Sequence, residues 1–230
     1  MRFQSRPYSR DERRKRGTLV GCLRGNPDGS GFFIYMFTGI ITHTGTISRT
    51  SPSKIAIRAD RDFVQKLGYG TSVSVGGVCL TVISKNSDSF SADIMPETAR
   101  RTTLGSLHRG DLVNLEHPAT PLSFLSGHIV QGHIDGIGTL RQIRAHKMGW
   151  IVSIASPAAL LRYIVAKGSI AVNGISLTVI GRGRSYFTVG IIPHTWKTTT
   201  FHELAQGSSV NIEVDVLAKY VETFVRDRRI

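Results

Sequence analysis

Apolar and polar residues alternate along several short stretches of the chain. The pattern occurs at residues 54–58, 72–75, 79–83 and 111–116. In a β-strand, such alternation turns one set of side chains toward a core and the other toward solvent. Runs rich in Gly, Asn, Asp and Ser separate the stretches and are typical of turns. Many short strands at close spacing predict an all-β barrel or sandwich rather than alternating strands and helices.

Helical periodicity is confined to a few segments. Residues 62–67 and 157–165 predict short helices, and Pro96 and Pro193 are expected to end strands. Residues 216–228 predict an amphipathic helix, whose apolar positions are Leu217, Tyr220, Val221, Phe224 and Val225. No part of its own unit is expected to cover this face, so we expect the helix to pack on another subunit.

A self-comparison shows two copies of one unit. Residues 77–116 align with residues 174–213 at a constant offset of 97, without a gap and with 16 identities. The segment from Gly39 to Ile47 aligns with residues 132–140 at an offset of 93. We divide the chain into a leader (1–35), a first unit (36–128), a second unit (129–217) and a C-terminal helix (218–230).

The chain is basic, with 29 Lys and Arg against 16 Asp and Glu and a formal net charge of +13. Such a charge suits nucleic acid, an anionic small substrate or solubility alone. The run 13–16 is the densest basic cluster, but short basic runs are usually solvated. No aromatic-basic RNA-binding motif accompanies it, so we expect no nucleic-acid partner.

Cysteines and hydropathy bear on location. Cys22 and Cys79 are the only cysteines and cannot build a disulfide framework, which favours a reducing cytoplasm. No run of about 18 apolar residues predicts a membrane helix. The apolar run 31–37 is short and no small-residue cleavage site follows it, which argues against a signal peptide.

Several motifs, in their order along the chain, resemble the riboflavin synthase family. They are MFTGII (36–41), GVCLTV (77–82), SGHIVQGHIDG (126–136), NGISLTV (173–179), IPHT (192–195) and NIEVDVLAKY (211–220). The resemblance covers about residues 36–225. Each motif is weak alone, but the ordered set over a tandem repeat is specific.

The resemblance implies two homologous six-stranded Greek-key β-barrels, a C-terminal helix for trimerisation and no metal or cofactor. It implies a homotrimer whose active site forms between the N-terminal barrel of one subunit and the C-terminal barrel of another, and leaves open an association with lumazine synthase. The implied reaction is a dismutation of two molecules of 6,7-dimethyl-8-ribityllumazine into riboflavin and 5-amino-6-(D-ribitylamino)uracil, the last step of riboflavin biosynthesis. Two homologous barrels can each hold one lumazine, and this proximity can lower the barrier by up to roughly 7–11 kcal/mol.

Five residues match the family's catalytic positions. Cys79 could add to or polarise an electrophilic ring carbon, and Ser72 could relay a proton beside it. His133 suits proton transfer from a lumazine methyl. Lys167 could stabilise the resulting anion, and Asp215 could hold a ribityl hydroxyl or a neighbouring catalytic group. Each also has a structural interpretation: a buried thiol, a strand serine or histidine, a solvated lysine, a capping aspartate.

The same resemblance implies a substrate-binding set distributed over both units. Threonine hydroxyls in it can bond ring carbonyls or the ribityl chain, although threonine is also common in strands. The set comprises Gly39, Ile40, Ile41, Cys79, Leu80, Thr81, Asp93, Ile94, Met95, Pro96, Glu97, Thr98, Gly132, His133, Ile134, Lys167, Ser176, Leu177, Thr178, Ile192, Pro193, His194, Thr195, Trp196 and Lys197.

The two units differ at chemically important positions. Ser176 stands in the second unit where Cys79 stands in the first, so the two pockets are unequal, as donor and acceptor roles require. His128, near His133, could be a second functional histidine or a structural one. The alternative to an enzyme is a non-catalytic lumazine- or flavin-binding protein of the same fold, but such relatives lose part of the catalytic set that this chain keeps.

The leader 1–35 has no counterpart in the family. Family members begin with Met-Phe, which here is Met36-Phe37. Met36 is therefore a candidate for the true start. The alternatives are a disordered basic arm and a targeting segment.

Overall fold

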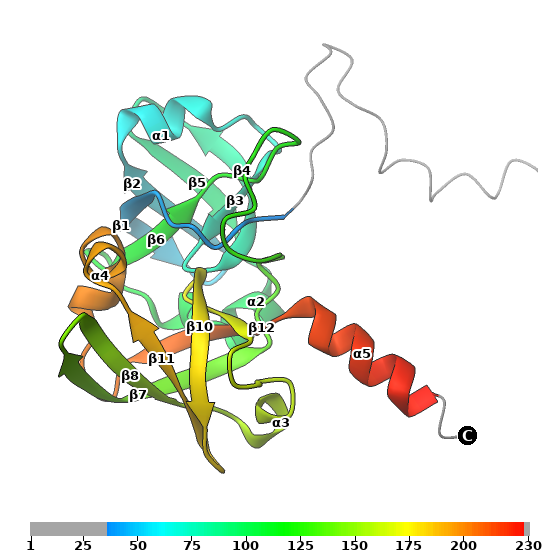
Figure 1. Ribbon diagram of the computed structural model, residues 1–230. Coiled ribbons are helices and arrows are strands. Elements are labelled where there is room, and N and C mark those ends of the chain that lie inside the picture. Colours follow the sequence, from blue (N-terminus) through cyan, green and yellow to red (C-terminus); the bar gives the residue numbers. More distant parts are fainter. Residues whose placement is uncertain (1–35, 228–230) are drawn as a thin grey trace, which may run out of the picture.

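The computed structural model describes residues 36–227, which form two closed antiparallel barrels, one above the other in Figure 1. The first barrel, in order around the sheet, is β1 (His43–Ser51), β2 (Lys54–Ala59), β5 (Ser89–Asp93), β4 (Val78–Lys85), β3 (Ser72–Val75) and β6 (Leu112–Glu116). The second is β7 (Gly136–His146), β8 (Gly149–Ala155), β11 (Tyr186–Ile191), β10 (Ile175–Arg182), β9 (Ser169–Val172) and β12 (Ser209–Val214). The order is the same in both, and the predicted pair of six-stranded barrels with a C-terminal helix is confirmed. The leader lies outside the described residues, and the domain boundaries stay predictions.

Each barrel encloses its own apolar core. In β2, Ile55 and Ile57 are fully buried while the residues beside them are not. Phe63 and Phe90 fill the centre of the first barrel, and Phe187 and Phe201 that of the second. Burying one such side chain stabilises the fold by roughly 1.5–3 kcal/mol.

The short helices close the barrels. Helix α1 (Arg61–Lys66) is capped by the Asp60 carboxylate, which accepts a hydrogen bond from Asp62 N at 2.8 Å, and it buries Phe63. Helix α3 (Ala158–Leu161) is shorter than the predicted 157–165. Beyond it the amides of Tyr163 and Ile164 bond carbonyls three residues back, a tightening that ends an α-helix.

The prediction that Pro96 and Pro193 end strands is wrong. Strands β5 and β11 end at Asp93 and Ile191, and the prolines begin α2 (Pro96–Arg101) and α4 (Pro193–Thr198). Proline is favoured at the first helical position because its ring fixes φ and the N–H it lacks would be unpaired there. The turns η3 (Thr103–Ser106) and η4 (Thr200–Glu203) follow.

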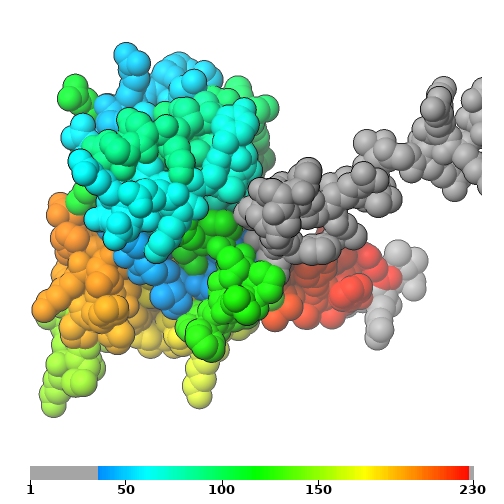
Figure 2. All heavy atoms as spheres, turned by 90° about the horizontal axis from the view of Figure 1, so that it is seen from above, coloured from blue at the N-terminus to red at the C-terminus, as the bar shows by residue number. Residues whose placement is uncertain are grey.

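The start of each unit crosses to the other barrel. We call residues 37–41 the first crossing segment and residues 130–134 the second. They pair through Phe37 N to Val130 O at 2.7 Å and Val130 N to Phe37 O at 3.1 Å. Ile41 then packs in the core of the second barrel, and Ile134 packs against that of the first. Figure 2 shows the chain near residue 40, in blue, between the cyan first barrel and the orange part of the second.

Two asparagines join the barrels in a symmetric way. Asn114 Nδ2 donates to Asn173 O at 2.9 Å, and its Oδ1 accepts from Thr200 N at 2.8 Å. Asn211 Nδ2 donates to Gly76 O at 2.8 Å, and its Oδ1 accepts from Thr103 N at 2.7 Å. Both side chains are fully buried. The barrels are therefore fixed relative to each other by paired polar groups, which are costly to break when buried.

Helix α5 (Val216–Asp227) projects away from both barrels in Figure 1. Its start is anchored by Asp215, whose carboxylate accepts from Leu217 N at 3.0 Å, and by the Lys219–Asp135 ion pair at 2.7 Å. No helix within residues 36–227 is long and apolar enough to span a membrane.

Candidate functional site

Cys79 lies where the second crossing segment meets β4. Its amide donates to Gly132 O at 3.0 Å, and its side chain packs against the apolar cluster of Phe37 and Val130 between the barrels. Gly132 must be glycine, because a Cβ there would lie 2.6 Å from the Cβ of Cys79 and its φ is +77. We call Cys79, Ser72 and residues 132–134 the Cys79 site.

The thiol of Cys79 is held in its neutral form. Burial raises its pKa, the nearby hydroxyl of Ser72 opposes this, and the charge of Glu213 raises it further. A thiol with a raised pKa is a poor nucleophile in the resting state. Its chemistry therefore depends on what a bound ligand places beside it.

An equivalent arrangement occurs in the second unit. Ser176 on β10 donates its amide to Gly39 O at 2.8 Å, as Cys79 does to Gly132. The Ser176 hydroxyl lies 2.7 Å from Nδ1 of His128. We call Ser176, His128, Lys167 and residues 39–41 the Ser176 site. The crossing segments thus give each barrel a wall made by the other unit.

His128, which the sequence leaves open as a functional or a structural histidine, lies beside Ser176. It is buried, and burial lowers its pKa while the charge of Asp215 partly opposes this. No described residue hydrogen-bonds its Nε2. A neutral imidazole bonded to a hydroxyl can accept a proton from it. The Gly-His pair recurring at 127–128 and 132–133 was the only signal for it in the sequence.

A cavity of about 700 Å³ opens at the Ser176 site, a size typical of small-ligand pockets. Six of its lining residues belong to the predicted set: Lys167, Ser176, Leu177, Thr178, Ile192 and Thr195. The sequence did not single out His146, Met148 and Trp150, which also line it. Residues from β8, β10 and β11 thus meet at one opening.

Lys167 reaches this cavity from an unusual backbone conformation. Its φ is +64, in the left-handed region, and its amide donates to Val179 O at 2.8 Å. In the first unit Gly70 holds the same place, with φ +78 and a 2.8 Å bond to Val82 O. Lysine costs free energy at such a position and glycine does not. The second unit therefore tolerates strain to place a cation at its cavity.

Two buried glutamates hold the crossing segments in place. Glu116 accepts from Thr38 N and Thr38 Oγ1, both at 2.7 Å, and from Gly39 N at 3.0 Å. Glu213 accepts from Gln131 N at 2.7 Å and Gly132 N at 2.9 Å. Burial raises the pKa of both, that of Glu213 to about 7. Their identity across the repeat, at inward strand positions, is the signal in the sequence from which this role can be predicted.

The remaining predicted residues of the first unit lie on β4, β5 and α2. Leu80 and Ile94 are buried in the core, whereas Thr81 and Asp93 are exposed. Met95 precedes α2 and residues 96–98 begin it, where Glu97 forms ion pairs with Arg100 and Arg101 that lower its pKa.

In the second unit, Pro193, His194, Trp196 and Lys197 lie on α4 beside the cavity without lining it.

The five predicted catalytic residues do not form one cluster. Ser72 and Cys79 lie together, with the exposed His133 next to Gly132. Lys167 belongs to the Ser176 site. Asp215 caps α5 and lines a different cavity, although its charge acts on His128. No group of three or more His, Cys, Asp or Glu side chains in residues 36–227 is placed to hold a metal ion.

Known proteins share this two-barrel fold. The family model of the lumazine binding domain matches residues 38–118 and 131–215, which defines the class as tandem lumazine-binding-domain proteins. Crystal structures of LumP with 6,7-dimethyl-8-(1'-D-ribityl) lumazine and with riboflavin are similar, at TM-scores of 0.70 and 0.72 and identities of 26% and 27%. Each similarity covers 78% of this chain and 99% of LumP.

Relatives with higher sequence identity are riboflavin synthases. Riboflavin synthase of Mycobacterium bovis is 45% identical over 200 residues, which is 83% of this chain and 98% of the relative. Riboflavin synthase of Bacillus subtilis is 37% identical over 194 residues, 83% of this chain and 90% of the relative. The chain belongs to the riboflavin synthase family.

Proposed function

We propose that this protein converts two molecules of 6,7-dimethyl-8-ribityllumazine into riboflavin and 5-amino-6-(D-ribitylamino)uracil. A four-carbon unit passes from one lumazine to the other, and the two products together contain the atoms of the two substrates. The observation that carries the proposal is the pair of equivalent sites with unequal chemistry, a thiol in one and a hydroxyl with a cation in the other. We propose that the reaction requires neither metal nor cofactor.

The residues of the Ser176 site suit the removal of a methyl proton from lumazine. Neutral His128, bonded to Ser176, can accept a proton, and the charge of Lys167 can stabilise the anion that remains. At the Cys79 site the neutral thiol, with Ser72 and His133, can donate or relay a proton to the second lumazine. The roles of Ser72, Cys79, His133, Lys167 and Asp215 in catalysis stay predictions.

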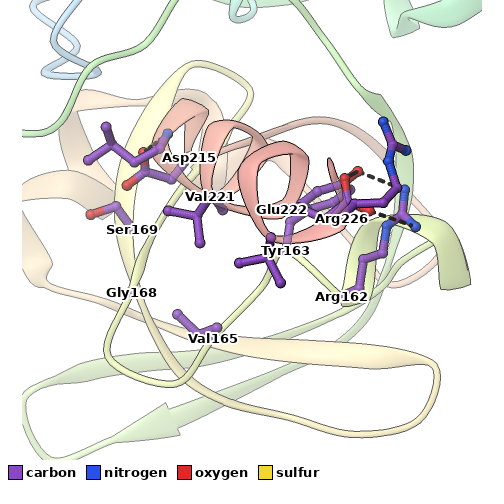
Figure 3. A pocket seen from close by; sticks show the side chains of 12 residues that line it. Arg162, Tyr163, Val165, Gly168, Ser169, Asp215, Val221, Glu222 and Arg226 are labelled. Carbon is purple, nitrogen blue, oxygen red and sulfur yellow. Dashed lines mark hydrogen bonds and ion pairs between the residues drawn. The ribbon is translucent and has the colours of Figure 1, made fainter. Parts of the chain in front are cut away.

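We also propose a homotrimer in which the Cys79 site of one subunit faces the Ser176 site of another. Leu217, Tyr220, Val221, Phe224 and Val225 on α5 are each more than half exposed, and an exposed apolar helix face is typical of an interface. Beside α5 runs a groove of about 700 Å³, whose lining includes Tyr163, Val165 and Val221 (Figure 3). Glu222 holds its edge through Arg162 at 3.2 Å and Tyr163 at 3.1 Å.

The cellular compartment and a partner protein are also part of the proposal. We place the protein in the cytoplasm, because two cysteines cannot form a disulfide framework. The association with lumazine synthase that the family implies stays a prediction.

The test is to mix the purified full chain with 6,7-dimethyl-8-ribityllumazine in the presence of a chelator and to follow riboflavin by absorbance. We expect one riboflavin for every two lumazines consumed. A second preparation starting at Met36 shows whether the leader affects turnover. Tight binding without riboflavin from either preparation would contradict the enzyme and support a lumazine carrier.

A further inference from the structure

The chain has two tryptophans, one lining the cavity at the Ser176 site and the other on the helix beside it. The rings of Trp150 and Trp196 stack, with centroids 4.2 Å apart and planes inclined by 13°. Trp150, on β8, lines the cavity, whereas Trp196, on α4, does not. One indole therefore forms part of the cavity wall and the other supports it.

The local backbone fixes this wall. Strand β8 begins at Gly149, whose φ is +140 and where a Cβ would lie 2.1 Å from the carbonyl oxygen of Ile191. Only glycine allows so close an approach, and it sets the pairing of Trp150 with Ile191. Trp196 is fixed from the other side, because its amide donates to Ile192 O at 3.0 Å.

The first unit lacks both indoles at the equivalent positions, and its hairpin is shorter, because Pro52 and Ser53 form the turn before β2. Ile94 N donates to Ser53 O at 2.8 Å, which makes Ser53 the counterpart of Trp150. Ala99 N donates to Met95 O at 3.0 Å, which makes Ala99 the counterpart of Trp196. The stacked pair Trp150 and Trp196 thus occurs only at the Ser176 site. The same site also has Lys167 where the first unit has Gly70, and Ser176 where the first unit has Cys79.

We infer that Trp150, supported by Trp196, stacks on the flat ring of the ligand and makes the Ser176 site the tighter of the two for extended aromatic rings. Dispersion attraction adds up over the atoms in contact, so a larger flat ring gains more from stacking on an aromatic side chain. Riboflavin has one ring more than lumazine and therefore gains more from stacking. Because only the Ser176 site offers an indole, this site holds riboflavin more tightly than the Cys79 site does. The inference rests on the proposed function, because it takes riboflavin as the product.

Each site has its own reporter. In the full chain carrying Cys22→Ser, tryptophan emission reports the Ser176 site and alkylation of Cys79 by iodoacetamide at pH 8.5 reports the other. Riboflavin should quench the emission at a concentration about tenfold below that which protects Cys79. If quenching needs as much riboflavin as protection of Cys79, or more, the inference is overturned.

Variants test the indole itself. Trp150→Leu, read through Trp196, should bind riboflavin about tenfold more weakly at the Ser176 site and leave protection of Cys79 unchanged. Trp150→Phe should retain most of the affinity, because it keeps an aromatic face. If Trp150→Leu does not fold, Trp196→Leu removes only the support and should weaken riboflavin severalfold. Unchanged affinity in a folded Trp150→Leu or Trp196→Leu protein would refute the role.

The two proposals fail in different ways. A wild-type protein that neither binds nor converts lumazine contradicts the proposed function. A protein that makes riboflavin but binds it equally at both sites contradicts only the role of Trp150.

Discussion

Single residues distinguish the two sites, although the two units share one fold. Gly70 and Lys167 make the same backbone hydrogen bond with left-handed φ values of +78 and +64. A left-handed conformation costs a residue with a Cβ roughly 1–2 kcal/mol, whereas glycine adopts it freely. The lysine is therefore poorly explained by folding and well explained by the cavity it reaches.

Replacing Lys167 by glycine should separate stability from activity. Glycine removes the strain of the left-handed backbone but loses more conformational entropy on folding. The first effect is slightly larger, so the free energy of unfolding should stay the same or rise by about 0.5 kcal/mol. Riboflavin formation should fall about 100-fold, because the cation no longer stabilises the substrate anion. Urea unfolding and initial rates measure the two effects. Lys147→Ala, which removes the same charge from the exposed hairpin tip, is the control and should leave the rate near wild type.

At the scale of elements, the crossing segments connect the fold to the sites. Each is held by one buried glutamate through two backbone amides, and each then accepts one amide from the neighbouring strand, at Cys79 or Ser176. Glu116 should therefore control the Ser176 site and Glu213 the Cys79 site.

The substitutions Glu116→Gln and Glu213→Gln serve as each other's control. Glutamine has one acceptor oxygen, so one backbone amide loses its partner at a cost of about 1–3 kcal/mol. Glu213→Gln should increase the alkylation rate of Cys79 with little effect on tryptophan emission, and Glu116→Gln should do the reverse. Equal effects of both variants on both reporters would show that the segments are not held separately.

The same elements show what the sequence could and could not predict. Alternation at Ile55 and Ile57 predicted a strand correctly, and the repeat predicted two equal barrels. Ile41 of the first unit packs in the second core, and Ile134 of the second unit packs against the first core. The sequence does not predict this exchange, because an apolar residue at either position fits the core of either barrel equally well. Trp150 was missed because it is apolar and its counterpart in the first unit is Ser53, so the repeat carries no signal for it.

At the scale of the whole molecule, assembly decides whether two sites can face each other. Phe224 is 65% exposed near the end of α5, on the helix that projects from the barrels. Its burial in a subunit contact would contribute roughly 1.5–3 kcal/mol, so a charge there should prevent association.

Phe224→Asp should therefore sediment as a monomer and lose most riboflavin formation while still binding lumazine. Phe224→Leu keeps the apolar face and should behave as wild type. Sedimentation velocity, lumazine titration and initial rates distinguish these outcomes. A monomeric Phe224→Asp protein with full activity would show that one subunit is sufficient and that the proposed trimer is not needed for turnover.

Acidity should act on stability through His117, at the end of the first barrel. Its ring packs on Phe63 at 4.0 Å, and burial, with the charges of His43 and Lys66, lowers its pKa to about 4. The unfolded chain, with a pKa near 6.5, then binds more protons than the folded chain. The stability that neutral His117 contributes is present above pH 6.5 and is lost as the pH falls toward 4. Glu213, whose raised pKa of about 7 gives the opposite slope between pH 4.5 and 7, obscures this in the wild type.

A comparison of variants isolates the effect. His117→Phe keeps the stacked ring and removes a buried Nε2 that no described residue hydrogen-bonds, so it should be more stable than wild type. The difference in unfolding free energy should grow by about 2 kcal/mol between pH 6.5 and pH 4, after allowance for solvent screening. Glu213 is unchanged in both proteins and cancels from the difference. Urea unfolding at several pH values measures it, and a difference independent of pH would mean that His117 titrates normally in the folded protein.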